Sequence, residues 1–404
     1  MYVLTKNGHI KGKIWPRSQF EKVDVLHWCL YNDSEEYRAK LLQLQEEERQ
    51  SRNKASGLTL PLEVIVEVFE ILYYMGKLKP KHLRLSKLFY VTLLPLFYRR
   101  PLLKGNNFLQ FVDTLSSNKT VGNYIRDLDL SFVNQSGKNA YVAKLLKRSR
   151  PLLQSFTAPQ TSFGLGPLMA LRSCFSLKVL DLRLVSETLN LEELFQSIRL
   201  LDNLTHLSFP RSSLEISNYR SVHWPPKLQF LRVSGGISDD FLIESDFPST
   251  IEHIEFAHCP KVMHVGFQHF LFKMGHNLKS LKVQFPMPGL QSNSLDIIFT
   301  YCPNLLVLEV TVDYMSAEFF DEENLHYLHY PRPLHTLYLD SSGMLGTTDK
   351  MDPLDLAVAL SDGRLPKLKN MRCTAKLGWD PKSDGVSYIA DELDERKGGL
   401  YIGY

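Results

Sequence analysis

The sequence predicts an α/β solenoid, a stack of repeated strand-and-helix units, with a small helical segment in front of it. Three observations support this fold class. A short apolar phrase recurs at a nearly fixed period, polar residues fill the positions inside the phrase, and a separate run near residue 60 has helical periodicity. A fixed period implies that each unit buries its apolar face only against its neighbours.

The recurring phrase is an apolar residue, two others, an apolar residue, one other, and an apolar residue. Successive starts lie roughly 23 to 34 residues apart, mostly 23 to 29, which is the period range of leucine-rich repeats. The ten instances are Ile125-Leu128-Leu130, Leu153-Phe156-Ala158, Leu177-Leu180-Leu182, Leu204-Leu207-Phe209, Leu228-Leu231-Val233, Ile251-Ile254-Phe256, Leu278-Leu281-Val283, Leu305-Leu308-Val310, Leu334-Leu337-Leu339 and Leu368-Met371-Cys373. We therefore expect a leucine-rich-repeat solenoid over residues 104–374, with parallel strands on its concave face.

The residue between the last two apolar positions should point out of the concave wall, because side chains alternate along a strand. These residues are Asp129, Thr157, Asp181, Ser208, Arg232, Glu255, Lys282, Glu309, Tyr338 and Arg372. Their mixed charge favours a protein or peptide partner over a nucleic acid. Charges of both signs concentrate at the predicted substrate-binding residues, Arg232, His253, Glu255, Lys279, Lys282 and Glu309. The alternative is that these side chains only keep the wall soluble.

Residues 58–103 have the pattern of a compact helical domain. Pro61 stands where a helix tolerates proline, in its first turn, and Gly76 is placed to end that helix. The apolar face of the helix consists of Val64, Ile65, Val68, Phe69 and Leu72. A second short helix should carry Leu83, Leu85, Leu88 and Phe89, and a third should be bent or restarted at Pro95.

Three separated blocks of this segment resemble an F-box of the fungal type. They are Leu60-Pro61-Leu62-Glu63-Val64-Ile65, Leu83-Arg84-Leu85-Ser86-Lys87-Leu88-Phe89-Tyr90 and Pro95-Leu96-Phe97-Tyr98-Arg99. The second block is one residue shorter than the usual form, and the box begins behind a leader rather than at the N-terminus. The turn after residue 254 adds a second likeness, because Ile254, Phe256, Cys259 and Val262 resemble the cysteine-containing repeats frequent in F-box proteins. There the cysteine is buried, so Cys259 is expected to be structural, as is Cys302.

The resemblance implies a function that the repeats alone do not supply. F-box proteins dock on the Skp-type adaptor of a cullin–RING ubiquitin ligase and offer a second domain to a protein substrate. Carried onto this chain, the adaptor contacts are Leu60, Pro61, Ile65, Phe69 and Leu72, with Leu83, Leu85 and Leu88 behind them. Two alternatives stay open. One is an adaptor-bound structural complex without cullin, and the other is a plain repeat scaffold in which residues 58–103 only cap the solenoid.

Bulk composition gives no reason to expect nucleic acid or an anionic membrane as partner. The 404 residues carry 47 basic and 44 acidic side chains, a net charge of +3. The five cysteines are scattered without a Cys-x-x-Cys pair, which suits a reducing compartment. No signal-peptide-like segment is found at the N-terminus, and the longest apolar run is too short to span a bilayer. We expect a cytoplasmic or nuclear protein.

We expect no catalytic residue, metal or cofactor. Histidines and Cys259 cluster between residues 253 and 276, but their spacing matches no compact zinc ligand set. The Gly164-Leu165-Gly166-Pro167 run lacks the third glycine of a nucleotide-binding loop, and Pro167 removes a backbone donor. The chain is therefore not expected to be an enzyme.

Both ends of the chain depart from the repeat period. Residues 1–57 form a leader whose charged helix, beginning near Ser34, is either a solvated helix or a partner-binding arm. Residues 375–404 form a tail that should either cap the last repeat or fold back along the concave wall. Between Asp340 and Leu365 lies an insertion in which Asp352-Pro353 can start a helix.

Overall fold

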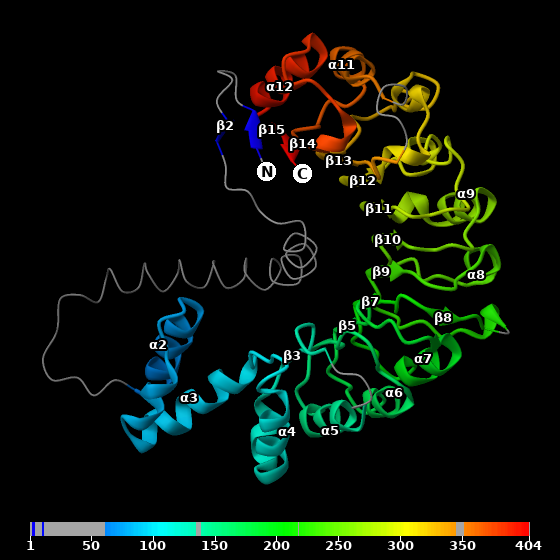
Figure 1. Cartoon of the computed structure of the whole chain (residues 1–404). Helices are drawn as coiled ribbons and strands as arrows, with labels where there is room; N and C mark the ends of the chain where they lie inside the picture. The colour runs from blue at the N-terminus through cyan, green and yellow to red at the C-terminus, as the bar shows by residue number, and fades with distance from the viewer. Residues whose placement is uncertain are drawn as a thin grey trace, which may run out of the picture. The chain divides into compact units, whose positions relative to one another are not determined.

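The computed structural model describes residues 2–4, 10–11, 61–134, 139–216, 218–344 and 351–403. The predicted leader helix and Leu60 lie outside these residues. The described residues fall into two compact units, one ending at residue 93 and the other running from residue 94 to 403 with a short N-terminal segment. Figure 1 shows the elements of both units along the chain.

The first unit is helical. Its elements are helix α2 (Leu62–Tyr74), the 3-10 helix η1 (Pro80–Arg84) and the first part of helix α3 (Lys87–Arg99). Gly76 follows α2 with a φ of 66°, the left-handed conformation that commonly ends a helix. The Ser86 hydroxyl accepts from the Phe89 amide at 3.1 Å and caps the start of α3. The expected helix stop at Gly76 is thus observed.

Helix α3 differs from the expectation of a second helix that carries Leu88 and Phe89 and a third that is bent or restarted at Pro95. One continuous helix runs through Pro95, so Leu88 and Phe89 belong to α3 rather than to a separate second helix. A helix-interior proline removes one backbone hydrogen bond, and that cost is tolerated here in a helix whose residues Leu93 and Leu96 are buried.

The second unit begins with helix α4 (Phe108–Ser117) and the 3-10 helix η2 (Lys119–Tyr124). The apolar face of α4 joins the same core cluster as the repeats through Phe108, Val112 and Leu115. Tyr98 near the end of α3 stacks on Phe111 with ring centroids 6.1 Å apart. Since a repeat array needs its open end covered, α4 acts as the cap at the start of the solenoid.

The repeats form one parallel sheet. The phrases form the strands β3 (Asp127–Asp129), β4 (Ser155–Thr157), β5 (Val179–Asp181), β7 (His206–Ser208), β9 (Phe230–Val233), β10 (His253–Ala257), β11 (Ser280–Gln284), β12 (Val307–Thr311), β13 (Thr336–Asp340) and β14 (Asn370–Thr374). Each of the ten phrases therefore contains a strand. Every apolar residue of the phrases is at most 5% exposed, which confirms the predicted solenoid.

Helices on the other side of the stack cover the sheet (Figure 1). The α-helices are α5 (Asn139–Ser149), α6 (Leu165–Leu171), α7 (Leu191–Ile198), α8 (Asp239–Glu244), α9 (His264–Met274), α10 (Ile298–Tyr301), α11 (Pro353–Ser361) and α12 (Asp384–Glu395). Short 3-10 turns fill the remaining connections: η3 (Tyr219–Ser221), η4 (Gly275–Asn277), η5 (Val312–Tyr314), η6 (Ala317–Phe320) and η7 (Ala375–Leu377). Strands β6 (Leu189–Asn190) and β8 (Ser213–Leu214) pair in a small separate sheet. A helix starting at Asp352-Pro353 was predicted within the insertion, and Asp352 caps α11 there. Its side chain accepts a hydrogen bond from the Leu354 amide at 2.9 Å.

The residues after 374 extend the sheet. Helix α12 leads into strand β15 (Gly399–Gly403), which pairs in parallel with β14. The sheet therefore continues beyond the boundary that the sequence placed at residue 374, and the tail adds an eleventh unit instead of folding back along the strand face. Next to β15 the strand order continues with β1 (Tyr2–Leu4) and β2 (Ile10–Lys11).

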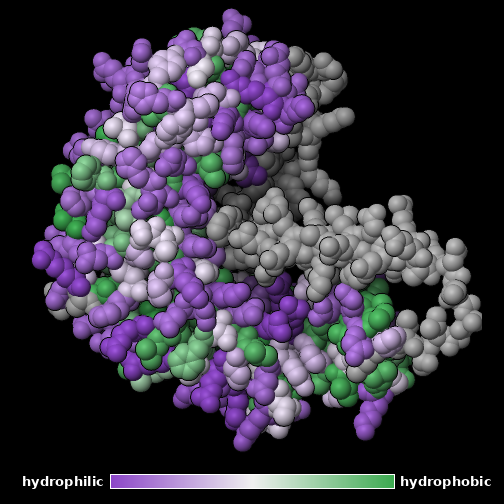
Figure 2. Space-filling view, turned by 180° about the vertical axis from the view of Figure 1, so that it is seen from behind, coloured by the Kyte–Doolittle hydropathy of each residue, from purple (hydrophilic) through white to green (hydrophobic). Residues whose placement is uncertain are grey.

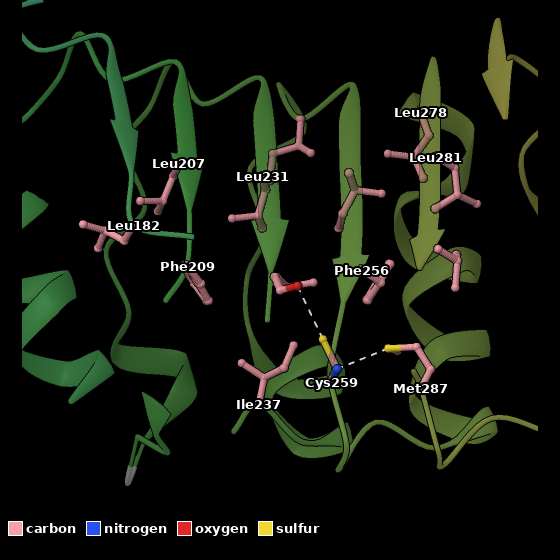
Figure 3. Packing of buried hydrophobic residues seen from close by; sticks show 14 of the residues in the cluster. Leu182, Leu207, Phe209, Leu231, Ile237, Phe256, Cys259, Leu278, Leu281 and Met287 are labelled. Atoms are coloured by element: carbon pink, nitrogen blue, oxygen red, sulfur yellow. Dashed lines mark hydrogen bonds between the residues drawn. The ribbon is translucent and has the colours of Figure 1, made fainter. Parts of the chain in front are cut away.

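Cys259 lies inside the turn that follows β10, as the repeat subtype implied. Its thiol contacts the Val233 carbonyl oxygen at 3.4 Å, and its amide donates to the Met287 sulfur at 3.3 Å (Figure 3). Burial raises the pKa of the Cys259 thiol to about 12. The thiol therefore stays protonated at neutral pH and packs as a small buried side chain.

We predict that Leu281→Ala in β11 lowers the free energy of unfolding by about 2–5 kcal/mol, because it empties a fully buried site between neighbouring repeats. Leu354→Ala in α11 is the matched control, since Leu354 is 52% exposed, and should change stability by less than about 0.5 kcal/mol. Urea unfolding followed by circular dichroism measures both. Equal losses for the two variants would contradict the buried position of Leu281.

Candidate functional site

The register of the parallel sheet aligns one outward residue from each of the ten repeat strands and from β15. The row consists of Asp129, Thr157, Asp181, Ser208, Arg232, Glu255, Lys282, Glu309, Tyr338, Arg372 and Tyr401, each the Cα partner of the next. We call this set the central polar row. The sequence predicted its first ten members, and β15 adds Tyr401.

Glu255 is the centre of an ion-pair network in this row. Its carboxylate accepts from Arg232 Nη1 at 2.5 Å, and Lys282 Nζ lies 3.9 Å from the same oxygen. Lys282 also pairs with Glu309 at 2.7 Å. Charges of alternating sign thus follow one another across β9, β10, β11 and β12, about 4.8 Å apart.

Burial and charge act in opposite directions on Glu255. The residue is only 5% exposed. Burial alone would raise its pKa, but Arg232, Lys282 and Arg183 lower it by more, and the net pKa lies below the ordinary value of a glutamate. Glu255 is therefore ionised at neutral pH and holds the two flanking cations in place.

The other predicted substrate-binding residues occupy different positions. His253 lies in the neighbouring outward row, in register with Phe230 and Ser280. Lys279 stands in the turn before β11 and pairs with Glu252 at 2.6 Å, outside the central polar row. The network thus gathers Arg232, Glu255, Lys282 and Glu309 but leaves Lys279 at its margin.

Two further contacts of the strand face were not foreseen from the sequence. Arg183 donates to Asp181 at 2.8 Å from the position directly after the phrase, two residues beyond Asp181. The Arg372 guanidinium lies over the Tyr338 ring, 5.0 Å from its centroid. A basic residue two positions after an acidic one was the available signal for the first pair. The second pair needed the strand register.

Two histidines on the strand face have strongly lowered pKa values. Burial lowers the pKa of His206 to about 4, with His253 adding a smaller effect, and its ring stacks on Phe230 at 5.6 Å. Burial likewise lowers the pKa of His253 to about 4. Both rings are neutral at pH 7, so the charge of this face comes from its acidic residues, arginines and lysines.

The helical unit presents a different kind of surface. Leu85, between η1 and α3, is 65% exposed, and Leu88 in α3 is 45% exposed. Val64 and Val68 in α2 and Val91 in α3 are exposed as well. Figure 2 shows hydrophobic surface over these helices. Contiguous exposed apolar surface is typical of interaction sites.

The residues predicted to contact an adaptor differ from one another in exposure. Pro61 is exposed, Ile65, Leu72 and Leu83 are half-buried, and Leu85 and Leu88 lie at the surface rather than behind it. Phe69 differs from these residues in its burial. It is 6% exposed and packs edge-to-face on Phe89 at 4.7 Å, so it belongs to the core of the unit.

Sequence comparison identifies the family. The chain is 46% identical over 326 residues to F-box protein YDR306C of Saccharomyces cerevisiae, covering 80% of this chain and 68% of that protein. The chain belongs to the fungal F-box proteins. It is also 32% identical over 348 residues to Protein pof5 of Schizosaccharomyces pombe, covering 85% of this chain and 99% of that protein. No family model matches the chain.

Among solved structures, an internalin (inlF) from Listeria monocytogenes superposes with a TM-score of 0.35 at 12% identity. The match covers 76% of this F-box protein and 92% of the internalin chain. That score is too low to support an argument about the fold, which rests on the parallel sheet itself. An F-box segment joined to a repeat solenoid makes the chain a protein-interaction adaptor.

Among the described residues, no helix is long and apolar enough to cross a membrane. The same residues contain no group of three or more His, Cys, Asp or Glu side chains that could hold a metal ion. Of the sequence cluster considered for zinc, Cys259 lies in the core while His253 lies in an outward row of the sheet.

We predict that Glu255→Gln costs about 2–4 kcal/mol of unfolding free energy, because it leaves Arg232 and Lys282 without their shared anion in a buried setting. Glu252→Gln is the matched control. It removes a more exposed pair with Lys279 and should cost less than about 1 kcal/mol. Urea midpoints at pH 7 compare the two variants, and similar small losses would show that the network contributes little.

We also predict that stability falls as the pH drops from about 6.5 to 4. The folded pKa of His206 lies below its unfolded value, so the unfolded chain binds the proton first and is favoured in that window. His206→Gln should remove about 2–3 kcal/mol of this pH dependence. Urea titrations at a series of pH values measure it, and an unchanged slope in the variant would contradict the assignment.

Proposed function

We propose that the protein is the substrate-recognition subunit of a cullin–RING ubiquitin ligase. In this proposal α2 and α3 dock on a Skp-type adaptor, and the strand face of the repeats holds a protein substrate. Membership of the F-box proteins supports the first part, and exposed Leu85, just before α3, and Leu88, in α3, supply an apolar docking surface. The central polar row, with its mixed charges, supports the second part.

The chain itself performs no chemistry in this proposal. It raises the effective concentration of the substrate beside the ubiquitin-charged enzyme, which is a proximity effect. It needs no cofactor and no metal, and it works where such ligases meet their substrates, in the cytoplasm or the nucleus. The observation that carries the proposal is the pairing of an apolar helical surface with a separate polar strand face on one chain.

Adaptor binding is tested by co-purification from fungal cells that express the chain. We predict that Leu85→Asp combined with Leu88→Asp lowers recovery of the Skp-type adaptor at least about tenfold, because two exposed apolar contacts become charged. Leu354→Asp with Val358→Asp is the matched control, since both residues are 52% exposed in another part of the fold. Equal recovery of the adaptor with both pairs of substitutions would contradict the assigned docking surface.

The same pull-down separates the alternatives. Cullin recovered with the adaptor supports a ligase subunit. Adaptor without cullin points to a structural complex outside the ligase, and no adaptor at all points to a plain repeat scaffold.

Substrate binding is tested with a ligase-trapping fusion that retains ubiquitinated proteins. We predict that Tyr338→Ala combined with Arg372→Glu keeps the adaptor but lowers capture of ubiquitinated partners at least about fivefold, because it removes a stacked pair from the central polar row. Capture that is unchanged by these substitutions, with adaptor binding intact, would place substrate recognition elsewhere.

A further inference from the structure

The loops that lead into β4, β5, β7 and β9 form a strip at the N-terminal ends of these strands. They are held to one another by side chains. The Ser176 hydroxyl donates to the Pro151 carbonyl oxygen at 3.2 Å, and the Asn203 amide donates to the Phe175 carbonyl oxygen at 3.1 Å. Lys227 Nζ then donates to Asn203 Oδ1 at 3.1 Å. Four consecutive loops are therefore fixed side by side.

Three of these loops each expose one large apolar side chain. Leu152, Phe175 and Leu200 are 44%, 55% and 57% exposed. None is required by the core, because the buried positions of the same repeats are already filled by Leu153, Leu177 and the other residues of the phrases. The three side chains therefore lie in three successive loops, which the Ser176 and Asn203 hydrogen bonds hold next to one another.

Basic side chains flank this apolar line. Arg150, Lys178, Arg199 and Lys227 are exposed on the same four loops. Asp202 is the exposed carboxylate among them. The strip thus has a net positive charge around an apolar centre, although the whole chain is close to neutral. We call it the basic–apolar strip.

We propose that the basic–apolar strip is a second docking surface, for a short acidic amphipathic helix of a partner protein. An amphipathic helix presents apolar residues along one face, at positions i, i+4 and i+8, and these can contact Leu152, Phe175 and Leu200 in three successive loops. Acidic residues beside them pair with Arg150, Lys178 and Arg199.

A protein helix fits these observations better than an anionic bilayer does. A lipid surface of uniform negative charge repels Asp202 at the centre of the strip, whereas a protein segment can place a basic residue opposite it. A strip of four loops is also small, which suits a weak and reversible protein contact. The strip is separate from the central polar row, so this proposal stands whether or not the ligase assignment holds.

Selection of peptides from a random phage-displayed library against the full chain tests the proposal. Binders that also recognise the Phe175→Ser, Leu200→Ser variant are removed by subtraction. The remaining peptides are expected to carry Leu or Phe at i and i+4 with Asp or Glu beside them. A remaining pool that is empty, or that is basic, would overturn the proposal.

The enriched peptide, labelled and measured by fluorescence anisotropy, gives the affinity. Phe175→Ser with Leu200→Ser, and separately Lys178→Glu with Arg199→Glu, are expected to raise Kd at least about tenfold. Leu354→Ser with Val358→Ser is the matched control and should leave Kd unchanged, with circular dichroism showing all variants folded. Flotation with vesicles containing about one-third phosphatidylserine distinguishes the other source of negative charge. Vesicle binding that is lost in the Lys178→Glu, Arg199→Glu variant would assign the strip to membranes and overturn the proposal.

Discussion

The constraint on which the structure depends is that each repeat can bury its apolar phrase only between its two neighbours. A unit with one buried strand and one covering helix has no core of its own. Every strand must therefore pair in the same register as the one before it, or its apolar residues would turn to the solvent side. That single requirement explains why residues as far apart as Asp129 and Tyr401 belong to one outward row.

The same register determines the electrostatics of the strand face. Because outward residues of adjacent strands stand about 4.8 Å apart, like charges in neighbouring strands would repel, and unlike charges form pairs. Glu255 between Arg232 and Lys282 follows this rule, and its low exposure makes the pairing necessary. A network of this kind stabilises the sheet, and it also presents a defined charge order to any segment that approaches it.

The sequence was sufficient for the repeats because their signal is local and periodic. The spacing of Leu278, Leu281 and Val283 predicts their strand without information from any other part of the chain. The eleventh strand was missed because its Leu400 and Ile402 are preceded by Lys397, where the phrase requires an apolar residue. The burial of Phe69 could not be predicted from the sequence for a different reason. It lies on the apolar face of α2, but only tertiary packing against Phe89 decides which part of that face is buried. The Tyr338–Arg372 contact likewise depends on register, which no short window of sequence contains.

The two surfaces of the protein differ in a way that bears on how it would work as an adaptor. Exposed leucines and valines on α2 and α3 have no polar groups to satisfy, so covering them releases water and favours a long-lived contact. The central polar row is already paired within the chain, and a partner must exchange those pairs for its own. Such an exchange yields little net affinity but strong discrimination between partners, since a wrongly placed charge is costly. In the proposed role of substrate receptor, the first surface would serve as the permanent docking surface and the second as the exchangeable recognition surface.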